Sequence, residues 1–166
     1  GQVAVLLSVE LCSLTLQLAD LSVANVIASG LFGDGAAAVV LKGGEQDPDD
    51  PRSAPSIVAS GSAFYPDTER VMGWDVVDSG LKVVLSAQVP EIVRQNVRDD
   101  VDAFLAMSGH SRSSIRHWIA HTGGPKVLQA FESALELPAD ALARSWKSLK
   151  EVGNLSSASV LFVLED

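Results

Sequence analysis

The feature that most restricts the fold is the succession of three signals within residues 115–137, "IRHWIAHTGGPKVLQAFESALEL". An apolar run ends at His121, a pair of glycines and Pro125 follow, and apolar residues then recur at helical spacing. A short apolar run bounded by glycines is typical of a buried strand, and proline fits the first turn of a helix. We therefore predict a strand over 115–121 and a helix over 125–137.

Strand-like and helical patterns alternate along the rest of the chain, which predicts an α/β fold with a mixed sheet and flanking helices. The run over 3–11, "VAVLLSVEL", is mostly hydrophobic, as in strands covered on both faces. The final stretch, 154–166, fits either a strand or a buried helix capped by Asn154 or Ser156. The remaining predictions are strands at 33–43 and 56–64, a hairpin around Ser79 and Gly80, helices at 20–32, 90–107 and 141–153, and an exposed acidic loop at 43–55.

Composition excludes several classes of function. Hydrophobic residues make up 47% of the chain and charged residues 20%, which is typical of a folded protein. The net charge of −9 gives no support to nonspecific nucleic-acid binding. One cysteine cannot form an internal disulfide, and neither a signal peptide nor a run long enough to span a membrane is visible. We expect a cytoplasmic protein. Because the chain opens inside one apolar run and stops just after another, we expect it to be truncated at both ends.

His121 is the first candidate for chemistry. Its position fits a strand-end histidine held by a backbone hydrogen bond. It also fits a functional imidazole, because Gly123 and Gly124 allow a ligand or backbone N–H groups to approach closely. The helix N-terminus that follows favours a nearby anion. Both interpretations remain open from the residues alone.

Asn154 is the second candidate, although helix capping is a sufficient explanation for it. A Cys–His–Asn set is one way to activate a thiol, but Cys12 follows an apolar run without a helix start that would stabilise a thiolate. We interpret Cys12 as a buried, inert cysteine. His110 and His117 lack metal-ligand spacing, so no metal site is expected.

Four segments, "ELCSLTLQ", "GLFGDGAAAVVL", "IAHTGGPKVL" and "VGNLSSASVLFVLED", occur in an order that resembles the C-terminal half of type III polyketide synthases, the chalcone and stilbene synthase-like family. The resemblance covers nearly the whole chain and implies a thiolase-like fold, with residues 1–166 as a C-terminal domain. It also implies a homodimer, and a nucleophilic cysteine in an N-terminal half that is absent here. The implied activity is extension of an acyl-CoA starter with malonyl-CoA by decarboxylative Claisen condensation and cyclisation, with CoA thioesters as substrates and no further cofactor.

The resemblance also assigns residues. His121 and Asn154 match the catalytic pair that binds the malonyl thioester carbonyl. Phe32 matches a phenylalanine at the junction of the CoA tunnel and the active site. Other positions match the loop beside the CoA arm (Gly123, Gly124, Lys126) and the cavity wall (Thr15, Trp74, Val83, Ser156).

Departures from the family pattern carry information too. Thr122 replaces a common proline, which predicts a slightly looser loop. Trp74 stands where a small residue is frequent and Val83 where a phenylalanine is frequent, which favours alkylpyrone or resorcinol-type products from aliphatic starters. Without the cysteine-bearing half we expect the chain to be inactive alone. The alternative is a noncatalytic or degenerate half that serves in dimerisation or acyl-CoA binding.

Overall fold

The computed structural model describes residues 1–44 and 55–166. Within them the chain forms five α-helices, three short 3-10 helices and two antiparallel strand pairs. The elements are, in order, β1 (Val3–Glu10), η1 (Cys12–Thr15), α1 (Val23–Leu31), β2 (Gly35–Lys42), β3 (Met72–Val77), β4 (Gly80–Leu85), α2 (Val89–Met107), η2 (Arg112–Ser114), α3 (Pro125–Leu135), α4 (Ala143–Val152), η3 (Ser156–Ala158) and α5 (Ser159–Glu165).

The helices begin and end at residues that the sequence marks. Ser22 caps α1 by accepting a hydrogen bond from the backbone N–H of Asn25 at 3.3 Å. Pro90 and Pro125 lie in the first turns of α2 and α3, where a missing N–H costs nothing. Gly153 ends α4 with a φ of 76°, a backbone conformation that residues other than glycine rarely adopt. For residues 154–166, the helical alternative is confirmed by α5.

Each of the two strand pairs joins two strands that are consecutive in the sequence. β1 and β2 run antiparallel from Val3 opposite Lys42 to Glu10 opposite Gly35. β3 and β4 form the hairpin predicted around Ser79. In the described residues no sheet has more than two strands, so the mixed sheet of the sequence prediction is not formed there.

Two predicted strands are wrong for the described residues. Neither 56–64 nor 115–121 pairs with another strand, and both segments are irregular. Residues 56–64 are also exposed throughout. A strand needs a neighbouring backbone to take up its N–H and C=O groups, and neither segment has one in the part of the chain described. The prediction that β1 is covered on both faces also fails, because Val5 and Leu7 are 58% and 70% exposed.

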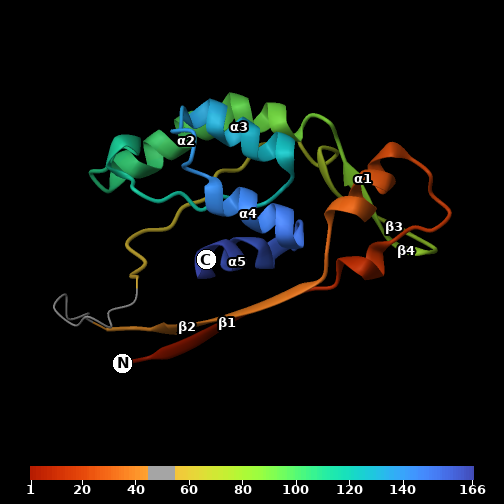
Figure 1. Ribbon diagram of the computed structural model, residues 1–166, viewed down its shortest axis with the longest axis horizontal. Helices are drawn as coiled ribbons and strands as arrows, with labels where there is room; N and C mark the ends of the chain where they lie inside the picture. Colours follow the sequence, from red (N-terminus) through yellow and green to blue (C-terminus); the bar gives the residue numbers. More distant parts are fainter. Residues whose placement is uncertain (45–54) are drawn as a thin grey trace.

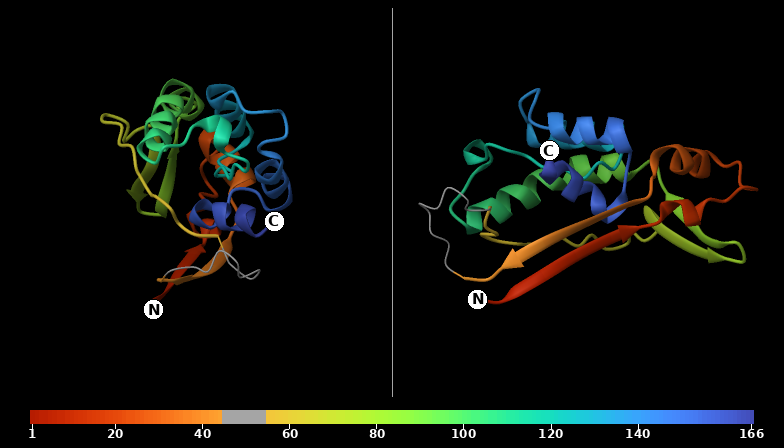
Figure 2. Two further views of the ribbon diagram at one scale, coloured as in Figure 1. Left: turned by 90° about the vertical axis from the view of Figure 1, so that its left-hand side faces the viewer. Right: turned by 60° about the horizontal axis from the view of Figure 1, so that its bottom comes forward.

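The elements stack in layers (Figure 1). α2 packs against α3, α3 contacts α4, and α4 contacts α5, which with η3 lies against the long β1–β2 ribbon. Figure 2 shows the ribbon extending along one side of these helices, with the N-terminus at its far end. The β3–β4 hairpin and α1 lie together at the other end of the molecule.

The best-packed core lies in the C-terminal third of the chain. Leu128 of α3, Leu142 before α4 and Val163 of α5 are all at most 1% exposed. Several polar side chains share this burial, among them Thr122, Ser145 and Asn154. Buried polar groups require hydrogen-bond partners, so these residues mark a region in which side-chain geometry is fixed. In the described ranges, no helix combines the length and apolar character needed to cross a bilayer.

Candidate active site

Three segments that are distant in sequence meet at the edge of this core. The backbone N–H of Asn154 donates to the Leu31 carbonyl at 2.8 Å, and the N–H of Gly33 donates to the Asn154 carbonyl at 3.0 Å. These two bonds make a parallel β-bridge between Phe32 and Asn154. The loop that follows His121 completes the cluster, because the Thr122 hydroxyl donates to the Gly153 carbonyl and Gly124 lies against the Leu31 side chain. The structure thus brings together the His121 loop, the Asn154 segment and the Phe32 segment.

Glycines make this close approach possible. A Cβ atom added to Gly153 would lie 2.7 Å from the Leu31 carbonyl oxygen, which is closer than such contacts occur. Gly124 has a φ of 127°, and an added Cβ would lie 3.3 Å from Leu31 Cδ2. At both positions a side chain would strain the backbone and push the segments apart. Gly124 and Gly153 are therefore needed to assemble the cluster.

The Asn154 side chain is 1% exposed and has a defined orientation. Its Oδ1 accepts hydrogen bonds from the Ser156 backbone N–H at 2.9 Å and from the Ser159 hydroxyl at 3.3 Å. Among the described residues, its Nδ2 donates no hydrogen bond. The amide oxygen therefore orders the turn that leads into η3, although Asn154 is the N-cap of neither η3 nor α5. Its Nδ2 group can donate to another acceptor.

His121 is half-buried and begins a tight turn. Its carbonyl accepts from the Gly123 N–H at 2.8 Å, and the preceding Ala120 N–H donates to the buried Ser145 hydroxyl at 3.1 Å. Burial lowers the pKa of the His121 imidazole, so the ring is neutral at pH 7. In the described part of the chain its ring nitrogens have no hydrogen-bond partner. A neutral imidazole of this kind has one N–H to donate and one nitrogen to accept.

Glu10 was not recognised from the sequence as part of this region. Its carboxylate accepts hydrogen bonds from the hydroxyl and backbone N–H of Ser157, and the Ser8 hydroxyl lies 2.6 Å from that of Ser157. The Ser157 hydroxyl is the main cause of a lowered Glu10 pKa, so this group is a carboxylate at neutral pH. The only signal in the sequence was a charge that ends an otherwise apolar strand. Ser156, a predicted cavity residue, lies beside this pair with a φ of 53°.

The predicted cavity residues Trp74 and Val83 lie on the β3–β4 hairpin, directly opposite each other across the strand pair. Val83 is 7% exposed and Trp74 49%. Thr15 lies in η1, which packs against β4, and its hydroxyl donates to the Cys12 carbonyl at 2.8 Å. The hairpin that carries Trp74 and Val83 also contacts α1, the helix that ends at Leu31.

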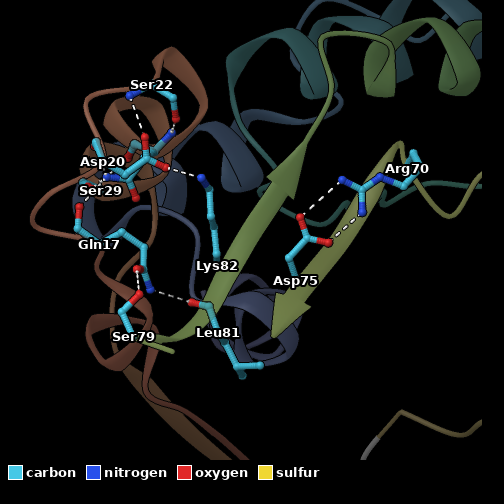
Figure 3. A network of polar contacts seen from close by, with 10 residues as sticks. Gln17, Asp20, Ser22, Ser29, Arg70, Asp75, Ser79, Leu81 and Lys82 are labelled. Atoms are coloured by element: carbon cyan, nitrogen blue, oxygen red, sulfur yellow. Dashed lines mark hydrogen bonds and ion pairs between the residues drawn. The ribbon is translucent and has the colours of Figure 1, made fainter. Parts of the chain in front are cut away.

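Polar contacts fix the hairpin to the segment after η1 (Figure 3). Gln17 donates to the Leu81 carbonyl at 3.1 Å and accepts from the Ser79 hydroxyl. Lys82 pairs with Asp20 at 2.8 Å and is the first cause of the lowering of the Asp20 pKa to about 2. The network therefore determines where Trp74 and Val83 lie relative to Thr15.

The remaining candidates behave differently. Lys126 is exposed in the first turn of α3, close to the loop but outside the cluster. Cys12 is half-buried rather than buried, and burial, with the charges of Glu10 and Asp34, raises the pKa of its thiol. A thiol with a raised pKa is a poor nucleophile at neutral pH. No group of three or more histidine, cysteine or acidic side chains in residues 1–44 and 55–166 is arranged to hold a metal ion.

Comparison with known proteins identifies relatives of both sequence and structure. The profile of the family described as "Chalcone and stilbene synthases, C-terminal domain" matches residues 56–166. The chain is 55% identical over 165 residues to 1,3,6,8-tetrahydroxynaphthalene synthase of Streptomyces peucetius subsp. caesius, covering 98% of this chain and 43% of that protein. Thus the chain spans less than half the length of this relative.

Solved structures agree with the sequence comparison. The crystal structure of PKS-I from the brown alga Ectocarpus siliculosus superposes with a TM-score of 0.89 at 30% identity, covering 99% of this chain and 43% of that one. The 1,3,6,8-tetrahydroxynaphthalene synthase of Streptomyces coelicolor A3(2) gives a TM-score of 0.87 at 32% identity, covering 98% and 44%. The thiolase-like fold expected from the sequence is therefore confirmed, for a part of the fold that corresponds to less than half of each neighbour.

Proposed function

Because this chain belongs to the chalcone and stilbene synthase family, we propose that the intact protein is a type III polyketide synthase. This acyltransferase extends an acyl-CoA starter with malonyl-CoA by decarboxylative Claisen condensation and then cyclises the product. The observation that carries the proposal is the junction of the His121 loop with the Asn154 segment, where two polar side chains have unused hydrogen-bonding groups. The remaining roles follow from the family resemblance.

The proposed chemistry uses His121 and Asn154 as paired donors. The malonyl thioester carbonyl oxygen accepts hydrogen bonds from Asn154 Nδ2 and from the N–H of the neutral His121 ring. When the C–C bond to the carboxylate breaks, carbon dioxide leaves and the electron pair forms an enolate whose negative charge rests on that oxygen. Donors held in place before the reaction stabilise this charge without reorganisation, which lowers the barrier.

The acyl-accepting thiolate belongs to a segment outside this chain. Cys12 is unsuited to the role, because burial and two neighbouring carboxylates disfavour its thiolate. The CoA arm passes Gly123, Gly124 and Lys126, and Phe32 stands at the entrance to the cavity. We also propose a cytoplasmic homodimer that takes CoA thioesters as its only substrates.

Replacement of His121 tests the function. In the intact protein, His121→Ala should lower the rate of malonyl-CoA decarboxylation by about 10²–10³, the usual effect of losing one oxyanion donor. The matched control is His117→Ala, because His117 is exposed on the same segment. The measurement is release of carbon dioxide from malonyl-CoA. Unchanged decarboxylation by His121→Ala would favour the alternative, a noncatalytic half that serves in dimerisation or acyl-CoA binding.

Two product classes have support. Trp74 and Val83 favour alkylpyrones or resorcinols from aliphatic starters, since they reshape the cavity wall. The relative at 55% identity favours 1,3,6,8-tetrahydroxynaphthalene, whose ten-carbon skeleton equals five two-carbon units. Mass spectrometry of products from the intact enzyme separates them. Malonyl-CoA alone should suffice for the naphthalene, whereas alkylpyrones require an added long-chain acyl-CoA. A strong preference for an aromatic starter would exclude both.

A further inference from the structure

Thr122 connects the two candidate catalytic segments. It follows His121 directly, is 0% exposed, and its hydroxyl donates to the Gly153 carbonyl at 3.2 Å. Gly153 directly precedes Asn154. This hydrogen bond therefore joins the residue after the histidine to the residue before the asparagine, across 31 positions of sequence.

Both ends of the bond are fixed by other contacts. On one side, the hydrogen bond from the Gly123 N–H to the His121 carbonyl closes a three-residue turn with Thr122 at its centre. On the other, Gly153 has a positive φ and lies so near the Leu31 carbonyl that an added Cβ would be 2.7 Å from its oxygen. The backbone of Asn154 is hydrogen-bonded to Leu31 and Gly33. A hydroxyl between two such constrained backbones sets their separation.

We propose that Thr122 is a positioning residue that sets the distance between His121 and Asn154 through its hydrogen bond to Gly153. This inference rests on the proposed function, in which both side chains donate to one thioester oxygen. Two donors converge on a single atom only within a narrow range of separations, and a displacement of about 1 Å can lower a rate about 10²-fold. Loss of the Thr122 hydrogen bond should therefore slow the decarboxylation step, in which negative charge develops on the thioester oxygen.

The surroundings of Thr122 also revise an expectation from the sequence. Replacement of the family's common proline predicted a looser loop. A proline would supply the same negative φ for the turn, but it has no hydroxyl to donate. The fully buried, hydrogen-bonded threonine instead ties the loop to the Asn154 segment. At this position, a hydrogen bond to Gly153 thus constrains the loop where the ring of a proline would otherwise do so.

The test is Thr122→Val in the intact protein, because valine keeps the shape of threonine and removes the donor. We expect kcat for malonyl-CoA decarboxylation to fall about ten- to hundredfold with KM within about twofold. The reason is that the misplaced donors stabilise the negative charge on the thioester oxygen less well in the transition state, whereas substrate binding is unaffected. Thr122→Ser should restore most of the rate. The matched control is Thr68→Val, which removes a threonine hydroxyl bonded to the Tyr65 carbonyl at 2.7 Å on a different part of the molecule.

The remaining outcomes are distinguishable. A wild-type kcat for Thr122→Val, or a raised KM with unchanged kcat, would overturn the positioning role, while the proposed function stands if His121→Ala still slows decarboxylation. Unchanged decarboxylation by His121→Ala would instead overturn the proposed function itself. If the valine variant does not fold, Thr122→Ser and Thr122→Ala give the same comparison, since they differ only in the hydroxyl. Equal rates for that pair would refute the inference.

Discussion

At the scale of single residues, the candidate site depends on backbone positions that only glycine can occupy. Gly153 combines a φ of 76° with a distance of 2.7 Å between an added Cβ and the Leu31 carbonyl oxygen. The neighbouring Asn154 takes its position from this glycine, so the orientation of the amide depends on a residue without a side chain. A substitution here affects stability and chemistry together.

Gly153→Ala should therefore destabilise the intact protein by about 1–3 kcal/mol, through backbone strain and the contact with Leu31, and should also reduce decarboxylation. Gly30→Ala is the matched control. Gly30 lies inside α1 with nothing within 4 Å of an added Cβ, and alanine there should stabilise by up to about 1 kcal/mol. Denaturant titration measures both. Equal stability of the two variants would contradict the role given to Gly153.

At the scale of elements, local signals were sufficient where an element is completed by its own residues. Ser22, Pro90, Pro125 and Gly153 mark helix ends in the sequence and do so in the structure. The hairpin around Ser79 was likewise predicted, because its two strands and the turn between them together span only 14 residues. Caps and tight turns depend on nearby atoms, so the sequence carries their cause.

Elements that need distant partners were predicted less well. The runs at 56–64 and 115–121 have the composition of strands, but composition does not supply the neighbouring backbone. The same limit applies to the site. His121 and Asn154 were identified from their sequence context, whereas the contacts of Glu10 with Ser157 and of Thr122 with Gly153 join positions 147 and 31 apart. Contacts of that kind follow from the folded arrangement alone.

At the scale of the whole molecule, many large apolar side chains are exposed. Leu7, Leu21 and Phe64 are between 70% and 88% exposed. Exposed apolar residues occur on β1, on α1 and in the segments between elements. Large apolar side chains exposed in this number promote association. The chain also covers less than half of each relative.

We expect the isolated 166-residue chain to elute from a sizing column as oligomers or aggregates and to bind a hydrophobic dye strongly, because this surface is open to water. It should also fail to form polyketide from acyl-CoA and malonyl-CoA. The intact protein, purified in the same way, is the control and should bind little dye. A sharp thermal transition of a monomeric 166-residue chain would contradict the expectation, as would product formation.

The backbone bridge between Phe32 and Asn154 limits how such an enzyme can be redesigned. Side chains near Phe32, at the entrance of the proposed cavity, can be exchanged freely only while the backbone that carries them keeps its position. Insertions or proline substitutions near Phe32 would displace the Asn154 amide together with the Phe32 segment. Starter scope and turnover would then change together, so libraries aimed at new starters should leave this stretch of main chain untouched.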